Sequence, residues 1–271
     1  MTSTSLPYMK NSPKIIFFTD FDGTITLKDS NDYMTDNLGF GAEERAKHNK
    51  DVLDGKRTFR DSFREMLESI NTPFDECIRS LVNAMELDPH FTEFYHWTKS
   101  VGIPIVVLSS GMVPIIRALF THCLGFEPDP EHLHIVANDV TPREGKTEAD
   151  INTAGGWTIK YHDESGFGHD KSREIKPYAE LPANVRPILL YAGDGVSDLS
   201  AARETDLLFA KKGHDLVTYC HREKIPHTLF ENWSSILQTT KDLYNGKATP
   251  KSLAIAEFKE EEAKGVDAVQ Q

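Results

Sequence analysis

Three short apolar runs, separated by long helical stretches, most constrain the fold of this chain. They are IIFF at Ile15, IPIVVL at Ile103 and PILLYAG at Pro187, and a shorter run, LLFAK, begins at Leu207. Continuous apolar runs of this length, bounded by turn residues, are typical of strands that are buried on both faces of a parallel sheet. The chain is therefore predicted to form an open, Rossmann-like α/β sheet with helices on both faces.

The stretch between the first two runs carries no strand signal and is patterned as several helices, interrupted at Gly39, Gly55 and Pro73. A single crossover helix needs far fewer residues, so this stretch predicts an inserted helical domain. A weak strand signal, a polar turn and WTIKY predict a β-hairpin over residues 135–161. Four parts are predicted: a flexible N-terminal arm (residues 1–13), a discontinuous core (14–30 and 98–245), a helical insert (31–97) and an acidic C-terminal tail (246–271).

The charge and cysteine content restrict the class of protein. The formal net charge is −12 at pH 7, and no dense basic stretch is present to neutralise a phosphate backbone, which argues against nucleic acid as a partner. No apolar run approaches the roughly 20 residues of a membrane helix. Cys77, Cys123 and Cys220 are odd in number and widely spaced. Reduced thiols in the cytoplasm are therefore expected, and the partner is expected to be a small molecule.

The first apolar run ends in two aspartates, Asp20 and Asp22, with one residue between them and a glycine after them. Like charges so close repel, and removing either from water is costly unless a cation lies nearby. One interpretation is that they are turn or capping residues, because aspartate is common at strand ends. The other is that they act on a phosphate ester with a metal ion. One carboxylate then attacks phosphorus, and the second transfers the proton.

A second acidic group follows the run at Pro187, in the sequence YAGDGVSDLSAA. Asp194 lies between two glycines directly after the predicted strand, and Asp198 follows four residues later. An ordinary strand-to-helix turn explains these residues on their own, because acids are favoured in the first turn of a helix. Together with Asp20 and Asp22, however, Asp194 brings a third carboxylate to one edge of the sheet, which suits Mg²⁺.

The other two signals at strand ends are polar or cationic. After the run at Ile103, the residues Ser109, Ser110 and Gly111 offer hydroxyls and free amides to an anion, although N-capping by either serine also explains them. Lys171 is placed in the first turn of a predicted helix, where a cation opposes the helix dipole. A bound phosphate would compensate for that cost, whereas the alternative is a solvated surface lysine.

These four signals, in this order, resemble the haloacid dehalogenase superfamily of phosphohydrolases. DFDGT, LSSG, Lys171 and GDGVSD match its first to fourth motifs, and the resemblance extends over roughly residues 14–244. The helical insert is similar to the C1-type cap of the phosphoserine-phosphatase-like branch. Within that branch, the stretches FTDFDGTITLKDSNDY, GFGHDKS and GDGVSDLSAA resemble the fungal polyol phosphatases.

The resemblance implies a role for each matching residue of a phosphomonoester hydrolase. Asp20 is the nucleophile that becomes phosphorylated, and Asp22 is the general acid and base. Ser109 and Lys171 bind the phosphoryl oxygens, with Ser110 beside them and Gly111 next in the motif.

The same resemblance implies a Mg²⁺ cofactor and a small phosphorylated metabolite as substrate. Mg²⁺ is held by Asp20, the backbone carbonyl of Asp22, and Asp194. Asp198 orients Lys171 or a water bound to the metal.

The helical insert carries the expectations about the substrate. Phosphoserine phosphatases clamp the substrate carboxylate with an arginine, and aligning TFRDSFREMLESI with that helix puts Met66 at its position. A buried carboxylate without a counter-charge is costly, so sugar-alcohol phosphates are expected over phosphoserine, unless Arg60 or Arg64 replaces the clamp. Asp29 either contacts the leaving group, together with the neighbouring Asn31, or caps the helix that follows it.

Three other functions stay open at this point. The first is a phosphoserine phosphatase, in which one of the two arginines serves as the clamp. The second is an inactive protein of the same fold that binds a phosphometabolite. The third is a signalling receiver domain, which also uses an acidic cluster and Mg²⁺ but carries its phospho-acceptor after a later strand and has no reason for a large helical insert.

Overall fold

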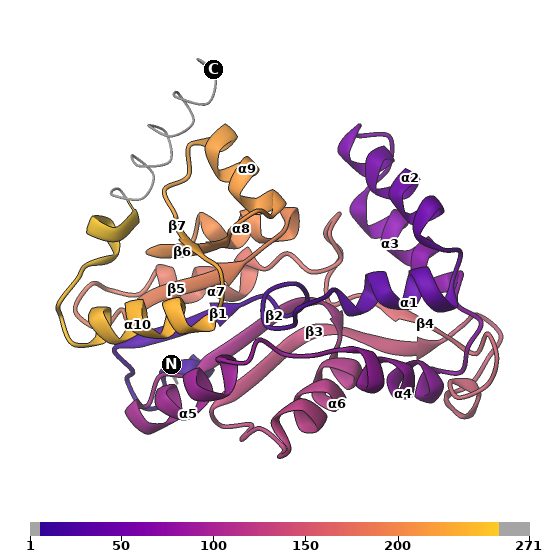
Figure 1. Ribbon diagram of the computed structural model, residues 1–271, viewed down its shortest axis with the longest axis horizontal. Helices are drawn as coiled ribbons and strands as arrows, with labels where there is room; N and C mark the ends of the chain where they lie inside the picture. Colours follow the sequence, from indigo (N-terminus) through magenta and orange to yellow (C-terminus); the bar gives the residue numbers. More distant parts are fainter. Residues whose placement is uncertain (1–5, 255–271) are drawn as a thin grey trace, which may run out of the picture.

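Residues 6–254, which the computed structural model describes, form a seven-stranded sheet with helices on both faces (Figure 1). The order across the sheet is β4-β3-β2-β1-β5-β6-β7. β3 and β4 pair antiparallel, and the other neighbouring pairs are parallel. The strands are β1 (Ile15–Thr19), β2 (Ile105–Met112), β3 (Leu133–Pro142), β4 (Trp157–Lys160), β5 (Ile188–Gly193), β6 (Leu207–Lys211) and β7 (Thr228–Phe230).

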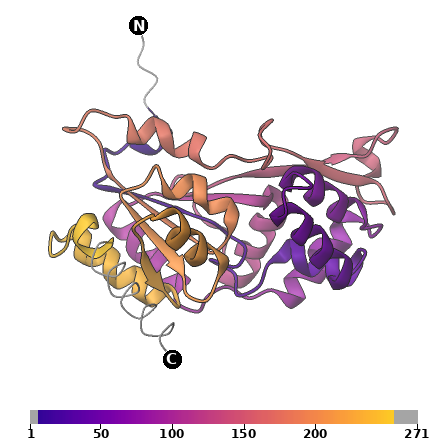
Figure 2. The same cartoon turned by 90° about the horizontal axis from the view of Figure 1, so that it is seen from above.

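The helices fall into an inserted group between β1 and β2 and a group that follows β2 in the chain (Figure 2). The first group comprises α1 (Ser30–Leu38), α2 (Ala42–Leu53), α3 (Phe59–Glu68), α4 (Phe74–Ala84) and α5 (Phe91–Val101). The second comprises α6 (Val113–Leu124), α7 (Ser172–Ala179), α8 (Leu199–Ala202), α9 (Asp215–Glu223) and α10 (Trp233–Tyr244). Short 3₁₀ turns are η1 (Pro7–Met9), η2 (Glu148–Asp150) and η3 (Val196–Asp198).

The four apolar runs of the sequence form β1, β2, β5 and β6, which lie next to one another in the sheet, so this prediction is confirmed. Thr19 at the end of β1 pairs with Val107 of β2 and with Ala192 of β5. The chain after β1 therefore emerges between two neighbouring strands at the carboxyl edge of the sheet. Ligands gather at this edge in open α/β sheets.

Two hydrophobic cores fill the two faces of the sheet. Successive residues of a strand point to opposite faces, and β1 supplies both cores in this way. The ring of Phe17 packs against Phe94 of α5 and Trp233 of α10, whereas the ring of Phe18 packs against Tyr178 of α7. The central strand is thus held rigidly from both sides, and so is the start of the loop that follows it.

The helical insert contacts the core through α3 and α4. Trp157 of β4 donates its indole N–H to the carbonyl of Thr72 at 2.9 Å, and Thr158 donates to the Glu68 carboxylate at 2.9 Å. α5 packs on the core sheet, although its first seven residues fall within the segment 31–97. The division of the chain into a core and a cap stays a prediction.

The hairpin predicted over residues 135–161 is confirmed by the antiparallel pairing of β3 with β4. In the described part of the predicted arm, Tyr8 of η1 stacks on Tyr178 with 5.2 Å between the ring centroids, and the flexibility of the arm stays a prediction. Residues 1–5, and residues 255–271 of the predicted acidic tail, lie outside the described part of the chain. Within residues 6–254, no helix has both the length and the apolar character that a membrane crossing requires.

Candidate active site

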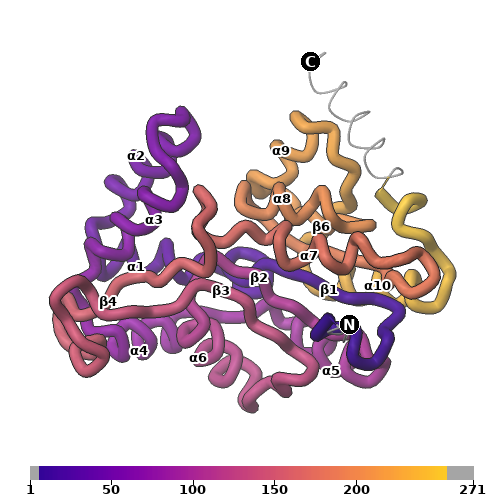
Figure 3. Tube along the Cα trace, turned by 180° about the vertical axis from the view of Figure 1, so that it is seen from behind, coloured from indigo at the N-terminus to yellow at the C-terminus, as the bar shows by residue number. Residues whose placement is uncertain are grey.

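A cavity of about 250 Å³ opens at the carboxyl edge of the sheet, between the helical insert and α9. In Figures 1 and 3, α2 and α3 stand on one side of this edge, and α8 and α9 stand on the other. The floor, at the edge of the sheet, is polar, whereas the walls carry both apolar side chains and polar ones such as Asn49, Ser62 and Asp215. The floor residues are Asp20, Asp22, Asp29, Asn31, Ser109, Ser110, Gly111 and Asp194, and the apolar wall residues are Val52, Leu53, Phe59, Phe63, Met66 and Val196.

Asp20 is the first residue after β1, and it is 7% exposed. Its Oδ1 accepts a hydrogen bond from the backbone N–H of Phe21 at 2.7 Å, and its Oδ2 lies 2.9 Å from Nζ of Lys171. Burial and the negative charge of Asp198 raise the pKa of Asp20, while Lys171 opposes this shift. The contact with Lys171 favours the ionised form of Asp20, against the effect of burial, and the ionised form is the one that can act as a nucleophile.

Lys171 is fully buried and joins two carboxylates. Its Nζ donates to Asp198 Oδ1 at 2.6 Å and contacts Asp20 at 2.9 Å. Burial by itself lowers the pKa of Lys171, but the charges of Asp198 and Asp20 outweigh burial and raise it above its usual value. The solvated-lysine interpretation is therefore wrong. An ammonium group has three N–H donors, so one is left over by these two ion pairs, although Lys171 itself is not among the residues that line the cavity.

Asp198 is saturated by donors. Its Oδ1 also accepts from the hydroxyl of Tyr191 at 2.6 Å, and its Oδ2 accepts from the backbone N–H groups of Asp194 and Gly195 at 2.9 and 3.0 Å. A carboxylate that already has four donors is poorly placed to bind a metal directly. Its position favours the expected role of orienting Lys171.

Asp22 has a different environment from Asp20. Its Oδ1 accepts from the backbone N–H of Ser30 at 2.8 Å, and its Oδ2 accepts from Nδ2 of Asn31 at 3.0 Å. Burial and the nearby charge of Asp29 raise the pKa of Asp22. Two carboxyl groups on one loop thus differ in environment: one contacts a cation, and the other neighbours an anion. Such a difference separates a nucleophile from a group that carries a proton.

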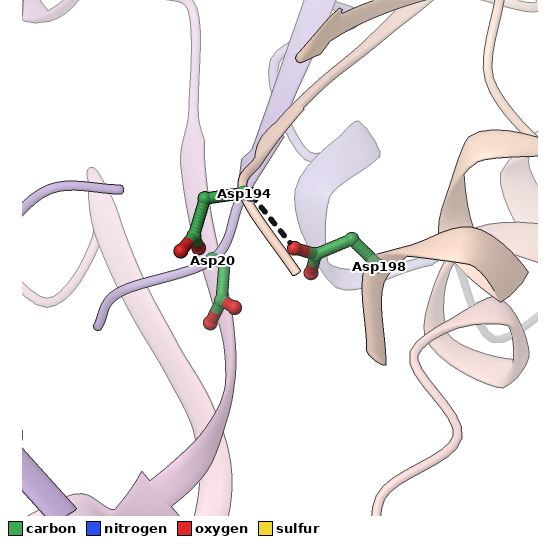
Figure 4. A group of neighbouring side chains, drawn as sticks. All are labelled: Asp20, Asp194 and Asp198. Carbon is green, nitrogen blue, oxygen red and sulfur yellow. Dashed lines mark hydrogen bonds between the residues drawn. The ribbon is translucent and has the colours of Figure 1, made fainter. Parts of the chain in front are cut away.

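Asp194 completes an all-oxygen cluster with Asp20 and Asp198 (Figure 4). Each of the three residues offers a carboxylate oxygen within 4.8 Å of the others. Asp194 Oδ1 accepts from the hydroxyl of Thr24 at 2.9 Å, and its Oδ2 lies 3.2 Å from Nδ1 of His214. Oxygen ligands of this kind suit a hard divalent cation such as Mg²⁺.

Gly23 explains why a glycine follows the two aspartates. Its φ is +71°, and a Cβ atom at this position would lie 2.4 Å from Oδ2 of Asp194. A side chain would therefore displace the third carboxylate as well as strain the backbone. The glycine lets the loop after β1 pass close to the end of β5.

The last residues of β2 do not cap α6. The N-cap residue of that helix is Met112, which makes no side-chain cap, so capping by Ser109 or Ser110 is wrong. Ser109 Oγ instead accepts from the backbone N–H of Gly111 at 3.0 Å, and Ser110 Oγ is buried without a partner among the described residues. Ser109, Ser110 and Gly111 all line the cavity, but the backbone N–H of Gly111 is already bonded to Ser109 Oγ.

His169 ties the segment before Lys171 to the end of β2. Burial lowers the pKa of His169 to about 4, so the ring is neutral near pH 7. Its Nδ1 lies 2.9 Å from the carbonyl oxygen of Ser109 and donates to it. Nothing in the sequence singled out this contact, which joins residues far apart in the chain.

Asp29 is the N-cap of α1, where its Oδ1 accepts from the backbone N–H groups of Asn31 and Asp32 at 2.7 and 2.9 Å. Capping is therefore confirmed. The residue also lines the cavity, so a contact with a leaving group stays a prediction. Burial raises the pKa of Asp29.

Met66 lines the cavity, but Arg60 and Arg64 do not. Arg64 lies over the ring of Tyr161, with 5.0 Å between the guanidinium carbon and the ring centroid. The Arg60 guanidinium donates to the carbonyls of Asp163 and Ser165, at 2.6 and 3.2 Å. No lysine, arginine or histidine is among the described residues that line the cavity. The structure thus does not bring Arg64, predicted to bind substrate, to this cavity.

The loop contacts of Arg60 predict a larger loss of stability than the ring contact of Arg64. Arg60→Ala removes charge-assisted hydrogen bonds to partly buried carbonyls, and we expect the free energy of unfolding to fall by about 1–3 kcal/mol. Arg64→Ala on the same helix removes only a cation–π contact, and we expect a loss of about 1 kcal/mol or less. Urea unfolding of both variants measures the difference, and equal losses would contradict this role of Arg60.

Several lining residues escaped the sequence analysis. Asp215 and Tyr219 of α9, and Asn49 of α2, contribute to the cavity. α9 follows β6, so its start lies at the same carboxyl edge as the motifs, and the strand signal at Leu207 could have pointed to it. The contribution of α2 depends on how the insert folds back over the sheet.

Comparison with known proteins adds independent information. The sequence model of the haloacid dehalogenase-like hydrolase family matches residues 17–203. The chain is 49% identical to Pdp3-interacting factor 1 of Schizosaccharomyces pombe, with 87% of this chain and 99% of that protein covered. It is 48% identical to polyol phosphate phosphatase PYP1 of Saccharomyces cerevisiae, with 87% of this chain and 96% of that protein covered.

More distant relatives share the fold over most of the chain. A 2-hydroxy-3-keto-5-methylthiopentenyl-1-phosphate phosphatase of Bacillus cereus is 26% identical, with 85% of this chain and 97% of that protein covered. Among solved structures, a phospho-aspartyl intermediate analogue of phosphoserine phosphatase superposes with a TM-score of 0.58 at 19% identity. That match covers 84% of this chain and 98% of the other, and it supports the α/β fold.

Proposed function

The chain belongs to the haloacid dehalogenase-like hydrolase family, and on that premise we propose that it is a Mg²⁺-dependent phosphomonoesterase acting on small polyol phosphates. The observation that carries the proposal is the pairing of Asp20 with the buried Lys171, beside a second carboxyl, Asp22, that contacts no cation among residues 6–254. This arrangement supplies an ionised nucleophile and a separate proton carrier within one cavity. Two such groups are what a stepwise phosphoester hydrolysis needs.

In the first step, Asp20 attacks phosphorus, and the bond between phosphorus and the ester oxygen breaks. The departing alkoxide takes a proton from Asp22 and leaves as an alcohol. The remaining N–H of Lys171 and the hydroxyl of Ser109 hold the phosphoryl oxygens. Their charge and dipoles are preorganised for the transition state, because the buried contacts already fix them.

In the second step, Asp22 accepts a proton from a water molecule that attacks phosphorus of the phosphorylated Asp20. The acyl phosphate bond breaks, inorganic phosphate is released, and both carboxyl groups return to their starting forms. The burial that raises the pKa of Asp22 suits a group that must alternate between donating and accepting a proton.

Asp20, Asp194 and the backbone carbonyl of Asp22 are the groups that would hold Mg²⁺ in this proposal. Bound there, the cation supplies charge neutralisation for the phosphoryl group, which lowers the cost of bringing two anions together. The fit of Mg²⁺ to this site rests on the cluster of carboxylate oxygens. Asp198 already accepts four hydrogen bonds, one of them from Lys171, so its role is to hold Lys171 and not the metal. A cytoplasmic location, expected from the cysteine content, accompanies the proposal.

The lining of the cavity supports a neutral, hydroxylated leaving group. Among its described residues it has the polar side chains of Asp29 and Asn31 but no cation. A carboxylate on the leaving group would be desolvated without a partner, whereas neutral hydroxyls can donate to these oxygens. The name of the 48% identical yeast protein, polyol phosphate phosphatase, agrees with this class of substrate.

A side-by-side measurement of kcat/KM tests the proposed substrate class. We expect sorbitol 6-phosphate, mannitol 1-phosphate or glycerol phosphate to exceed phosphoserine by at least about a hundredfold, because an uncompensated buried carboxylate costs several kcal/mol. Excess EDTA should abolish hydrolysis of every substrate, and added Mg²⁺ should restore it. A preference for phosphoserine would contradict the argument from Met66 and the missing cation.

The remaining alternatives have distinct signatures in the same experiment. An inactive binding protein would bind phosphomonoesters without releasing inorganic phosphate. Membership of a hydrolase family argues against the receiver-domain interpretation. So does the position of Asp20, which follows the first strand, β1, whereas a receiver domain carries its phospho-acceptor after a later strand. Phosphoserine phosphatase activity would show as phosphoserine turnover that exceeds every polyol phosphate.

A further inference from the structure

Asn31 makes an incomplete set of hydrogen bonds in the floor of the cavity. It lies in the first turn of α1, is 4% exposed and lines the cavity. Its Nδ2 donates to Asp22 Oδ2 at 3.0 Å. Its Oδ1 is buried and has no partner among residues 6–254. A buried acceptor without a donor is costly, so this atom marks a place where a ligand can supply a hydrogen.

The orientation of the Asn31 amide follows from its surroundings. Asp22 needs its own proton for the ester oxygen, so it must meet Asn31 as an acceptor. Turning the amide over would then place Asn31 Oδ1 beside Asp22 Oδ2, and two acceptors at hydrogen-bond distance repel each other. Nδ2 must therefore face Asp22, and Oδ1 must point away from it. The backbone N–H of Asn31 is already held by the capping carboxylate of Asp29, which fixes the start of the side chain.

We propose that Asn31 is a specificity-determining residue that requires a hydroxyl on the carbon adjacent to the one that carries the phosphate ester. This inference rests on the proposed phosphomonoesterase function. The ester oxygen lies beside Asp22 when it receives its proton, and the amide of Asn31 is bonded to that same carboxyl. On a vicinal diol, the second oxygen is about one hydrogen-bond length from the first in the gauche form, so its hydrogen reaches Asn31 Oδ1.

The proposed contact joins recognition to chemistry through one side chain. Nδ2 holds the carboxyl that transfers the proton, and Oδ1 accepts from the leaving group. A substrate with the vicinal hydroxyl fills the vacant acceptor and is aligned with Asp22, whereas a substrate without it leaves a buried acceptor unpaired. Sites built to bind a hydroxyl discriminate strongly against analogues that lack it.

The experiment compares two isomeric substrates, 1,2-propanediol 1-phosphate and 1,3-propanediol monophosphate. They have the same charge and formula and differ only in the position of the free hydroxyl. We expect the natural protein with Mg²⁺ to prefer the 1,2-isomer in kcat/KM by about ten- to a hundredfold. In Asn31→Ala, this ratio should fall to within about threefold of one, while Asn37→Ala, an exposed change on the same helix, should leave it unaltered.

Two further measurements separate specificity from simple loss of structure. p-Nitrophenyl phosphate has a leaving group that departs without a proton and carries no hydroxyl. The factor by which Asn31→Ala lowers kcat/KM should therefore be at least about ten times smaller on this compound than on the 1,2-isomer. Asn31→Asp keeps the shape and an acceptor but replaces the donor to Asp22. We expect it to keep a preference for the 1,2-isomer while hydrolysing both alkyl esters more slowly.

The outcomes distinguish the two levels of the argument. One outcome is that the natural protein releases phosphate from neither propanediol phosphate, nor from p-nitrophenyl phosphate, nor from any polyol phosphate. That result overturns the proposed function, and the inference about Asn31 with it. If the natural protein is active but shows no preference between the isomers, or if Asn31→Ala keeps that preference, the inference alone is overturned. If Asn31→Ala does not fold, loss of the isomer preference in Asn31→Asp likewise overturns it.

Discussion

Asp20→Asn should reduce phosphatase turnover to background. A neutral amide is a poor nucleophile and a poor metal ligand, so the substitution removes both the group that attacks phosphorus and one of the proposed oxygens for Mg²⁺. It also removes one of the two negative charges in contact with the buried Lys171. The measurement is phosphate release from a polyol phosphate at saturating Mg²⁺.

The fold of Asp20→Asn can be checked against a matched change elsewhere. Asp139→Asn alters an exposed aspartate on β3, and we expect full activity from it. The far-ultraviolet circular dichroism of both variants should match that of the natural protein, because the amide replaces the carboxylate without a change of volume. Substantial turnover by a well-folded Asp20→Asn protein would refute the aspartyl-phosphate mechanism.

Lys171→Met should lower kcat by about 10²–10³, the usual effect of removing one preorganised group that stabilises transition-state charge. The side chain is fully buried and keeps a similar length in methionine, so packing changes little. The charge, however, is lost, and the carboxylates of Asp20 and Asp198 then face each other without a cation. We expect a loss of stability as well as of activity.

Lys176→Met provides the control for Lys171→Met. Lys176 lies on α7, whose N-cap residue is Lys171, and its exposed side chain makes a 4.0 Å ion pair with Glu180. Exposed pairs of this kind contribute little to stability, so this variant should retain its activity and its midpoint of unfolding. If Lys171→Met remained as active as the Lys176→Met control, a phosphate-binding role for Lys171 would be untenable.

Lys171 also shows how far an argument from local sequence extends. Its place at the start of a helix, against the helix dipole, indicated that something compensates for its charge. The structure supplies two carboxylates, one from the loop after β1 and one from the turn after β5, in addition to any bound phosphate. The local conflict could be recognised from the sequence, but the identity of the partners depended on contacts between distant segments.

The arginines of α3 illustrate the opposite case. A helical pattern shows which residues share a face, but it leaves open which face meets the cavity. Met66 lines the cavity, whereas Arg60 reaches the loop at Asp163 and Arg64 lies over Tyr161. The rotation of α3 is set by its packing against β4 and the loop after it, which are nearly a hundred residues away in the chain.

The sequence by itself determined the four central strands, their parallel arrangement and the order of the four motifs, because apolar periodicity and turn residues act over a few neighbouring positions. The edge strand β7 was not predicted. Only the tertiary structure decided which side chains meet. The contact of Asn31 with Asp22, the saturation of Asp198 and the absence of a cation from the described lining all depend on strand register and on how the helical insert lies over the sheet. These are set by packing between segments far apart in the chain, which no local pattern records.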